Sequence, residues 1–235
     1  MRNIKAVFIK QMLSYFKNPT RWGAPAAFLL IPFMLLTLSP GSGEHRVQFT
    51  TQFLTMFVGI AMIGNSSGFI VEDKSTMNLR FMSMAGVKPY QYLIATCGVL
   101  LVVSLGVLIL FGLIAGHSGE IMLNFLILSM LGAATSMLLG ITLGLSKVAP
   151  FSLVVAILLG GGPAWATDFG MEVLSRIMYL TFTYQVNTAL RGDLTMLPMG
   201  AIQIVLINMA VILAAFVIMN IRTGLDGERL EKAGG

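Results

Sequence analysis

The sequence predicts an all-α membrane protein with six membrane-spanning helices, and three observations indicate this class. Six apolar stretches, each about long enough to cross a bilayer as a helix, lie at residues 22–39, 51–71, 93–115, 121–145, 151–167 and 200–221. None of them contains Asp, Glu, Lys, Arg or His. The 235-residue chain is 56% hydrophobic and only 11% charged, with a mean hydropathy of +0.85. Because hydrocarbon cannot hydrogen-bond exposed peptide groups, runs of this length are expected to be helices rather than strands of an open sheet.

The first element, residues 1–21, is expected to be an amphipathic helix in the membrane interface. Apolar side chains recur near helical spacing with lysines between them: Ile4, Lys5, Phe8, Lys10, Leu13, Phe16 and Lys17. Asn18 and Pro19 then end the segment. A general basic anchor and a specific contact with a partner are equally compatible with this pattern. Residues 22–221 form the predicted six-helix transmembrane domain, and residues 222–235 form a short tail.

The basic residues are distributed unevenly between the two sides of this map. Twelve fall on one side: Arg2, Lys5, Lys10, Lys17, Arg21, Lys74, Arg80, Lys88, Lys147, Arg222, Arg229 and Lys232. The other side has Arg46, Arg176 and Arg191. The positive-inside rule therefore predicts that both termini are cytoplasmic, in the cytoplasmic (inner) membrane of a bacterial cell. The net charge is +5, but the basic residues are distributed as the positive-inside rule requires. The lipid bilayer therefore accounts for them, and no nucleic acid partner is expected.

A short cytoplasmic helix is predicted over residues 72–86, after the second span. Glu72, Asp73 and Ser75 provide a helix start with acidic residues in the first turn, and Gly86 provides a stop. One face carries polar residues, namely Asp73, Thr76, Arg80 and Ser83, and another carries Met77, Phe81 and Met84. The apolar face requires something to cover it.

Residues 168–199 form a long external connection that is too apolar for a plain loop. A first amphipathic helix is expected around Leu174, Ile177, Met178, Thr181 and Phe182, and a second around Val186, Ala189 and Leu190. The preceding run from Gly160 to Pro163 is expected to loosen or bend the fifth span, because glycine adds backbone freedom and proline removes a helix hydrogen bond.

The sequence offers little for cofactor or redox chemistry. Cys97 is the single cysteine, which excludes an intramolecular disulfide and a cysteine-based metal site. A phosphate-binding loop of the Gly-x-x-x-x-Gly-Lys-Ser type does not occur, so no cofactor is expected in this chain. The lack of ionisable residues within the spans disfavours a proton-driven carrier.

The order of these parts resembles the permease subunits of type-2 ABC transporters, which export drugs, peptides, lipids and polysaccharides. Glu72-Asp73-Lys74, followed by Leu79-Arg80 and Ala85-Gly86-Val87, is similar to the family's segment after span two. Thr183-Tyr184-Gln185-Val186 and Ala189-Leu190-Arg191-Gly192 are similar to its run before span six. The chain departs from the family at Thr183-Tyr184, where an Asn-Pro pair is common.

The resemblance implies that residues 72–86 are a coupling helix that docks on a separate ATPase subunit, which binds ATP and Mg²⁺. The candidate coupling residues are Glu72, Asp73, Met77, Arg80, Phe81 and Met84. Met77, Phe81 and Met84 would fill a groove on the ATPase, with Asp73 and Arg80 at its polar margin. It also implies a second permease copy, identical or not. The small size, without a large external domain, resembles permeases of drug and bacteriocin export or self-immunity.

Three alternatives remain open from the residues alone. An ion-independent secondary transporter could use backbone carbonyls or polar side chains, and a purely structural membrane protein would need neither a coupling helix nor an external cap. An intramembrane hydrolase is the enzymatic alternative, because Ser66 and Ser67 stand between Gly64 and Gly68. Its catalytic partners are missing, since His45 and His117 fall in predicted external loops and no Asp or Glu lies in a span.

Polar residues within the spans suggest a candidate substrate path, and small residues suggest a face for helix packing. The candidate substrate path comprises Asn65, Ser66, Asn124, Ser136 and Asn208, in spans two, four and six. Hydrogen bonding between helices is the simpler interpretation, and a lining for an apolar or amphipathic peptide, antibiotic or lipid-like cargo is the functional one. Gly132, Ser136, Gly140 and Gly144 repeat every four residues and form a predicted helix-packing face.

The topology can be tested with single cysteines in a Cys97→Ala background. Cysteines at Gly43 and Gly192 should react with a membrane-impermeant thiol reagent added to intact cells, because both positions are predicted to be external. A cysteine at Ser75 should react only after the cells are opened. Labelling of Ser75→Cys in sealed cells would contradict the predicted orientation.

Overall fold

The chain is built from helices, as the sequence predicts. The computed structural model describes residues 2–38, 43–146, 148–168 and 170–223, and every regular element within these ranges is helical. The first half contains α1 (Arg2–Lys17), α2 (Pro19–Leu38), α3 (Gly43–Met56), the π-helical turn η1 (Phe57–Ala61), α4 (Met62–Ser75), α5 (Asn78–Met84) and α6 (Pro89–Ala115). The second half contains α7 (Gly119–Leu145), the 3₁₀ turn η2 (Ala149–Phe151), α8 (Ser152–Asp168), α9 (Glu172–Met178), α10 (Phe182–Arg191) and α11 (Met199–Thr223).

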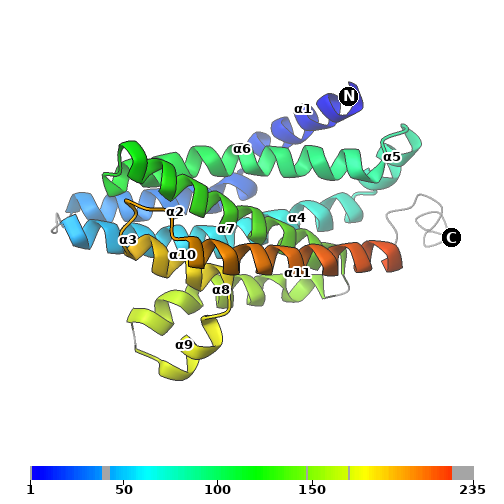
Figure 1. Ribbon diagram of the computed structural model, residues 1–235. Coiled ribbons are helices and arrows are strands. Elements are labelled where there is room, and N and C mark those ends of the chain that lie inside the picture. Colours follow the sequence, from blue (N-terminus) through cyan, green and yellow to red (C-terminus); the bar gives the residue numbers. More distant parts are fainter. Residues whose placement is uncertain (1, 39–42, 147, 169, 224–235) are drawn as a thin grey trace.

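Six helical segments among the described residues are long and apolar enough to cross a membrane: Arg21–Leu38, Arg46–Ser75, Tyr90–Ala115, Gly119–Leu145, Ala149–Asp168 and Met199–Ile218. Each overlaps one of the six predicted spans. Figure 1 shows them running along a common direction, with α1 and α5 at one end of the bundle and α9 projecting from its side. We call the end that carries α5 the α5 end. The predicted tail lies outside the described residues apart from Arg222 and Thr223, which continue α11.

The second span is one continuous helical path from Gly43 to Ser75, formed by α3, η1 and α4. Helix α3 therefore begins before Thr50, where the sequence predicted an external loop. The π-helical turn lies where α8 approaches most closely: a Cβ atom on Gly59 would stand 2.5 Å from the backbone nitrogen of Gly160. Only glycine at both positions permits this contact between backbones.

The sequence predicted that the glycine-rich run would loosen or bend the fifth span, and helix α8 continues through this run. The helix is continuous from Ser152 to Asp168, and Gly160, Gly161, Gly162 and Pro163 are buried within it. Gly160 packs on η1, and a Cβ on Gly162 would lie 2.7 Å from the Met178 methyl group of α9. The run therefore provides close packing on two neighbouring elements.

The small residues of α7 face the second span. A Cβ on Gly140 would stand 2.5 Å from the carbonyl oxygen of Ile63, and a Cβ on Gly144 would stand 2.9 Å from that of Ser67. Gly132, two turns earlier, would meet Val186 of α10 at 2.9 Å. Because lipid provides no hydrophobic driving force between helices, this close approach contributes van der Waals attraction that bulkier residues would prevent.

The segment between α8 and α11 contains two short helices, but their boundary differs from the prediction. Helix α9 ends at Met178, and Thr181 is the N-cap of α10, where its hydroxyl accepts a hydrogen bond from the Tyr184 amide at 3.4 Å. Phe182 accordingly begins the second helix. Helix α10 packs inside the bundle against α3, α7, α8 and α11.

The contact between α7 and α4 can be tested with matched glycine substitutions. Gly140→Ala should lower the free energy of unfolding by about 1–3 kcal/mol, because the new methyl group meets the Ile63 backbone. Gly106→Ala on α6 is the control, since nothing lies within 4 Å of a Cβ there. The free energy of unfolding of both variants is measured by titrating the detergent-solubilised protein with SDS and following the circular dichroism. Equal stability of the two variants would contradict the close approach.

Candidate functional site

The segment after the second span forms two helices instead of the single one predicted. Helix α4 continues to Ser75, so Glu72 and Asp73 lie in its last turn and not in the first turn of a new helix. The Ser75 and Thr76 hydroxyls and the Thr76 amide all donate to the Glu72 carbonyl, and α4 ends at Thr76, whose φ of −88° and ψ of 5° depart from helical values. Met77 then adopts a positive φ of 54° and α5 begins at Asn78. The predicted helix start was wrong, because the backbone leaves the helical conformation at Thr76 and Met77, after Glu72 and Asp73 and not before them.

Asp73 is buried, with 4% of its surface exposed. Its carboxyl group accepts hydrogen bonds from the Tyr92 hydroxyl of α6 at 2.6 Å, from the Gln11 amide of α1 at 3.0 Å and from the Asn78 amide of α5 at 3.1 Å. The sequence placed Asp73 at the margin of a docking surface. The structure instead places it between four helices, where it ties α5 to α1 and α6.

Arg21, at the start of the first span, contacts Glu72 from a buried position. Its guanidinium lies 2.6 Å from the Glu72 carboxyl and 3.8 Å from the centre of the Phe69 ring, and only 8% of its side chain is exposed. The guanidinium also donates to the Ser14 hydroxyl at 3.3 Å. Tyr15 stacks on the other side of this cluster against Phe69; burial raises the pKa of Tyr15 to about 12, and Arg21 opposes the shift. Arg21 thus joins α1, α2 and α4.

Lys74 connects the end of α4 to α7. Its ammonium group donates to the carbonyl oxygens of Gly144 and Leu145, both at 2.9 Å, at the C-terminal end of α7. A cation at this position satisfies carbonyls without helix partners and interacts favourably with the helix dipole. The end of α4 is therefore connected to α2 through Glu72 and to α7 through Lys74. Asp73 connects it to α1, α5 and α6. We call these three residues and Gln11, Arg21, Asn78 and Tyr92 the α4 terminal network.

Helix α5 and the residue directly before it, Met77, present three large apolar side chains to the surroundings, and we call these three side chains the apolar surface of α5. Met77, Phe81 and Met84 are 54%, 61% and 67% exposed, whereas Met82 on the same helix is buried in the core. Arg80 lies within α5, and its side chain is outside the described part of the structure. Of the six candidate coupling residues, Met77, Phe81 and Met84 are thus on the surface, while Glu72 and Asp73 belong to the α4 terminal network.

Two of the three candidate substrate-path asparagines hold the segment around α10. Asn124 of α7 donates to the Leu194 carbonyl, just after α10, and Asn208 of α11 donates to the Leu180 carbonyl, just before it. Asn187, which sequence reasoning missed, donates to the Thr55 hydroxyl of α3 at 3.0 Å. Arg191 pairs with Asp168 at 2.6 Å, linking the ends of α10 and α8. Asn124 and Asn208 thus bond to the connections on either side of α10, and Asn208 also donates to the Ile204 carbonyl of its own helix.

The remaining path candidates have different surroundings. The Ser66 hydroxyl donates to carbonyls of its own helix, those of Met62 and Ile63. Ser136 is fully buried in α7, and its hydroxyl has no partner within the described residues. Asn65 lies half-buried on α4. The five candidate substrate-path residues thus differ from one another in burial and in hydrogen-bond partners.

Two other groups bear on the hydrolase alternative. Ser67 donates to the Gly64 carbonyl and the Ser152 hydroxyl, while half-buried His117 packs against the Phe125 ring with centroids 5.0 Å apart. Burial lowers the pKa of His117. Among the described residues, no three His, Cys, Asp or Glu side chains gather as metal ligands would.

Comparison of the chain with protein-family models, with curated proteins and with solved structures finds no match.

The α4 terminal network can be tested at Asp73. Asp73→Ala should destabilise the fold by about 1–3 kcal/mol or more, because it leaves the buried Tyr92 hydroxyl and Gln11 amide without their acceptor. Asp73→Asn retains one acceptor oxygen and should have a smaller effect. Amide hydrogen exchange in α1 should increase in Asp73→Ala, since α1 loses a link to α4. Unchanged exchange and stability, relative to the control Gln203→Ala at an exposed position of α11, would contradict this role.

Proposed function

We propose that this chain is the membrane-spanning permease subunit of an ATP-driven transporter of the type-2 ABC class. A separate ATPase subunit would bind ATP and Mg²⁺, and this chain would contribute the path across the membrane. The observation that carries the proposal is the exposed apolar surface of α5, formed by Met77, Phe81 and Met84, at one end of a bundle with six candidate spans. A partner protein would remove this surface from contact with water.

The attachment of α5 supports a role in transmitting motion. Asn78 connects the start of α5 to Asp73, and the Val87 amide, after its end, bonds to the Met82 carbonyl. Met82 itself is buried in the core. A displacement of α5 by a docked ATPase would therefore act on α4 through Asp73, and on α1 and α6 through Gln11 and Tyr92.

The proposed cargo is an apolar or amphipathic molecule, such as an antibiotic, a peptide or bacteriocin, or a lipid-like compound, and the proposed direction is export. The spans lack a cluster of basic residues that would suit a strongly anionic cargo. A second permease copy would complete the path. Asn65 and Ser136 remain candidates for its lining, and an ion-independent carrier or a structural protein would be indicated if no ATPase binds.

The coupling surface can be tested with matched phenylalanine substitutions. Phe81→Ala should weaken binding of the proposed ATPase subunit to the permease in nanodiscs by at least about tenfold, because aromatic anchors that become buried on docking dominate interfaces. Phe151→Ala is the control, since Phe151 is 62% exposed and Phe81 is 61% exposed. Stimulation of ATP hydrolysis by the permease should decrease in parallel. Equal binding by both variants, or no binding by the unmodified chain, would count against the proposal.

A further inference from the structure

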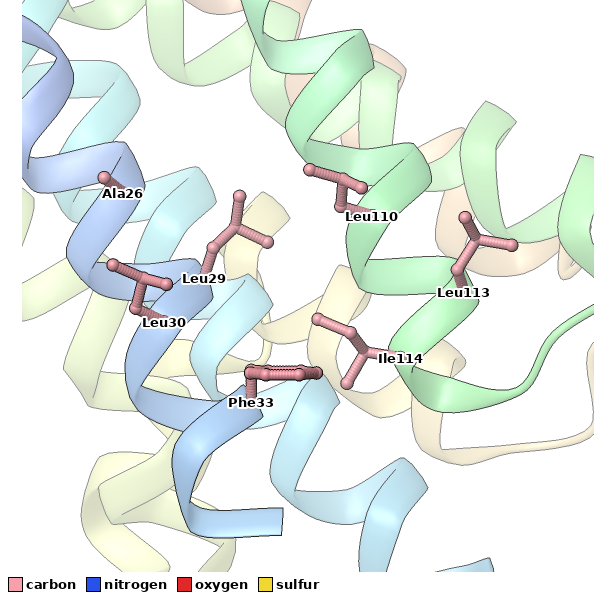
Figure 2. Close-up of a pocket in the computed structure, with 7 residues that line it drawn as sticks. All are labelled: Ala26, Leu29, Leu30, Phe33, Leu110, Leu113 and Ile114. Carbon is pink, nitrogen blue, oxygen red and sulfur yellow. The ribbon is translucent and has the colours of Figure 1, made fainter. Parts of the chain in front are cut away.

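An apolar groove lies between α2 and α6, away from the α4 terminal network (Figure 2). Its volume is about 540 Å³, within the range of about 300–1,000 Å³ that is typical of small-molecule sites. Ala26, Leu29, Leu30 and Phe33 line it from α2, and Leu110, Leu113 and Ile114 line it from α6. Figure 2 shows the Phe33 ring and the Ile114 side chain pointing toward one another across the groove.

The position of the groove along the two helices places it at membrane depth. Both helices are among the six candidate spans. Helix α6 begins near the α5 end and finishes at Ala115, so its lining residues occupy the last turns of the span. Residues 26–33 lie in the middle and later part of α2. The groove therefore opens toward hydrocarbon, in the half of the bundle remote from α5.

The lining excludes a polar ligand. All seven side chains are aliphatic or phenyl groups, and a polar ligand atom placed among them would lose its hydrogen bonds to water without replacement. Leu30, Phe33, Leu110 and Leu113 remain between 49% and 61% exposed, so the chain itself does not cover the groove. The occupant must be apolar along the buried length.

The groove is too small to enclose a helix of a second copy. An α-helix is about 10 Å wide and rises ~1.5 Å per residue, so each residue occupies roughly 120 Å³. A volume of about 540 Å³ would hold little more than one turn. Helices α2 and α6 also contact each other, and a single flexible apolar chain can follow the space that remains between them.

We propose that this groove binds one acyl chain of a membrane phospholipid. The chain would lie along the groove between Phe33 and Ile114, with its methylene groups against the leucines of both helices. Such binding would persist longer than contact with the surrounding bilayer, because the chain meets side chains on two sides instead of one. The proposal is independent of ATPase docking at α5.

The experiment compares neighbouring alanines of α2. Ala26 lines the groove, whereas Ala27 is exposed and outside the lining. The protein is reconstituted in bilayers containing phosphatidylethanolamine with a photoactivatable acyl chain, illuminated and digested, and the labelled peptides are identified by mass spectrometry. We expect labelling of residues 110–114, reduced about tenfold by Ala26→Trp and unchanged by Ala27→Trp. If Ala26→Trp does not fold, Leu110→Trp takes its place. This variant fills the groove from α6, and its labelling is again compared with that of Ala27→Trp.

Two results would overturn the proposal. Equal labelling in Ala26→Trp and Ala27→Trp, or labelling spread evenly over the exposed faces of α8 and α11, would show only general contact with the bilayer. Efficient disulfide formation between two copies carrying Leu113→Cys in a Cys97→Ala background, with loss of lipid labelling, would show that a second copy covers the groove.

Discussion

A buried carboxyl group is stable only where donors surround it, and Asp73 meets this condition with side chains from three other helices. Tyr92, Gln11 and Asn78 provide these donors. The neighbouring residues extend the connection, because Glu72 pairs with Arg21 and Lys74 caps α7. The positions of α1, α2, α5, α6 and α7 relative to α4 at this end of the bundle depend on these three consecutive residues.

Farther along the bundle, backbone proximity replaces polar contacts as the organising interaction. Gly140 and Gly144 bring α7 against α4, and Gly59 and Gly160 bring η1 against α8. Polar contacts return around α10, where Asn124 and Asn208 bond to carbonyls on either side of the helix. The fold therefore combines a polar network at the α5 end, glycine contacts along the spans and an asparagine-held helix between α8 and α11.

This arrangement separates the two surfaces that have functional interest. The apolar face of α5 is attached to the α4 terminal network through Asn78, so a partner bound there would act on residues that already connect several helices. The groove of α2 and α6 lies in the other half of the bundle and contains no member of that network. Proposed protein docking and proposed lipid binding thus use different residues and can be altered separately.

The sequence by itself determined the helical class and six candidate spans, because hydropathy and length are local properties that a bilayer reads directly. It also indicated two short helices before α11 and the exposed side chains of α5. Only the tertiary structure decided that Asp73 is buried, because its partners Gln11 and Tyr92 lie 62 and 19 residues away along the chain. The break at Thr76 and Met77 and the groove between α2 and α6 were likewise visible only in the tertiary structure. Helical periodicity describes which side chains share a face, whereas burial depends on which other helix packs against that face.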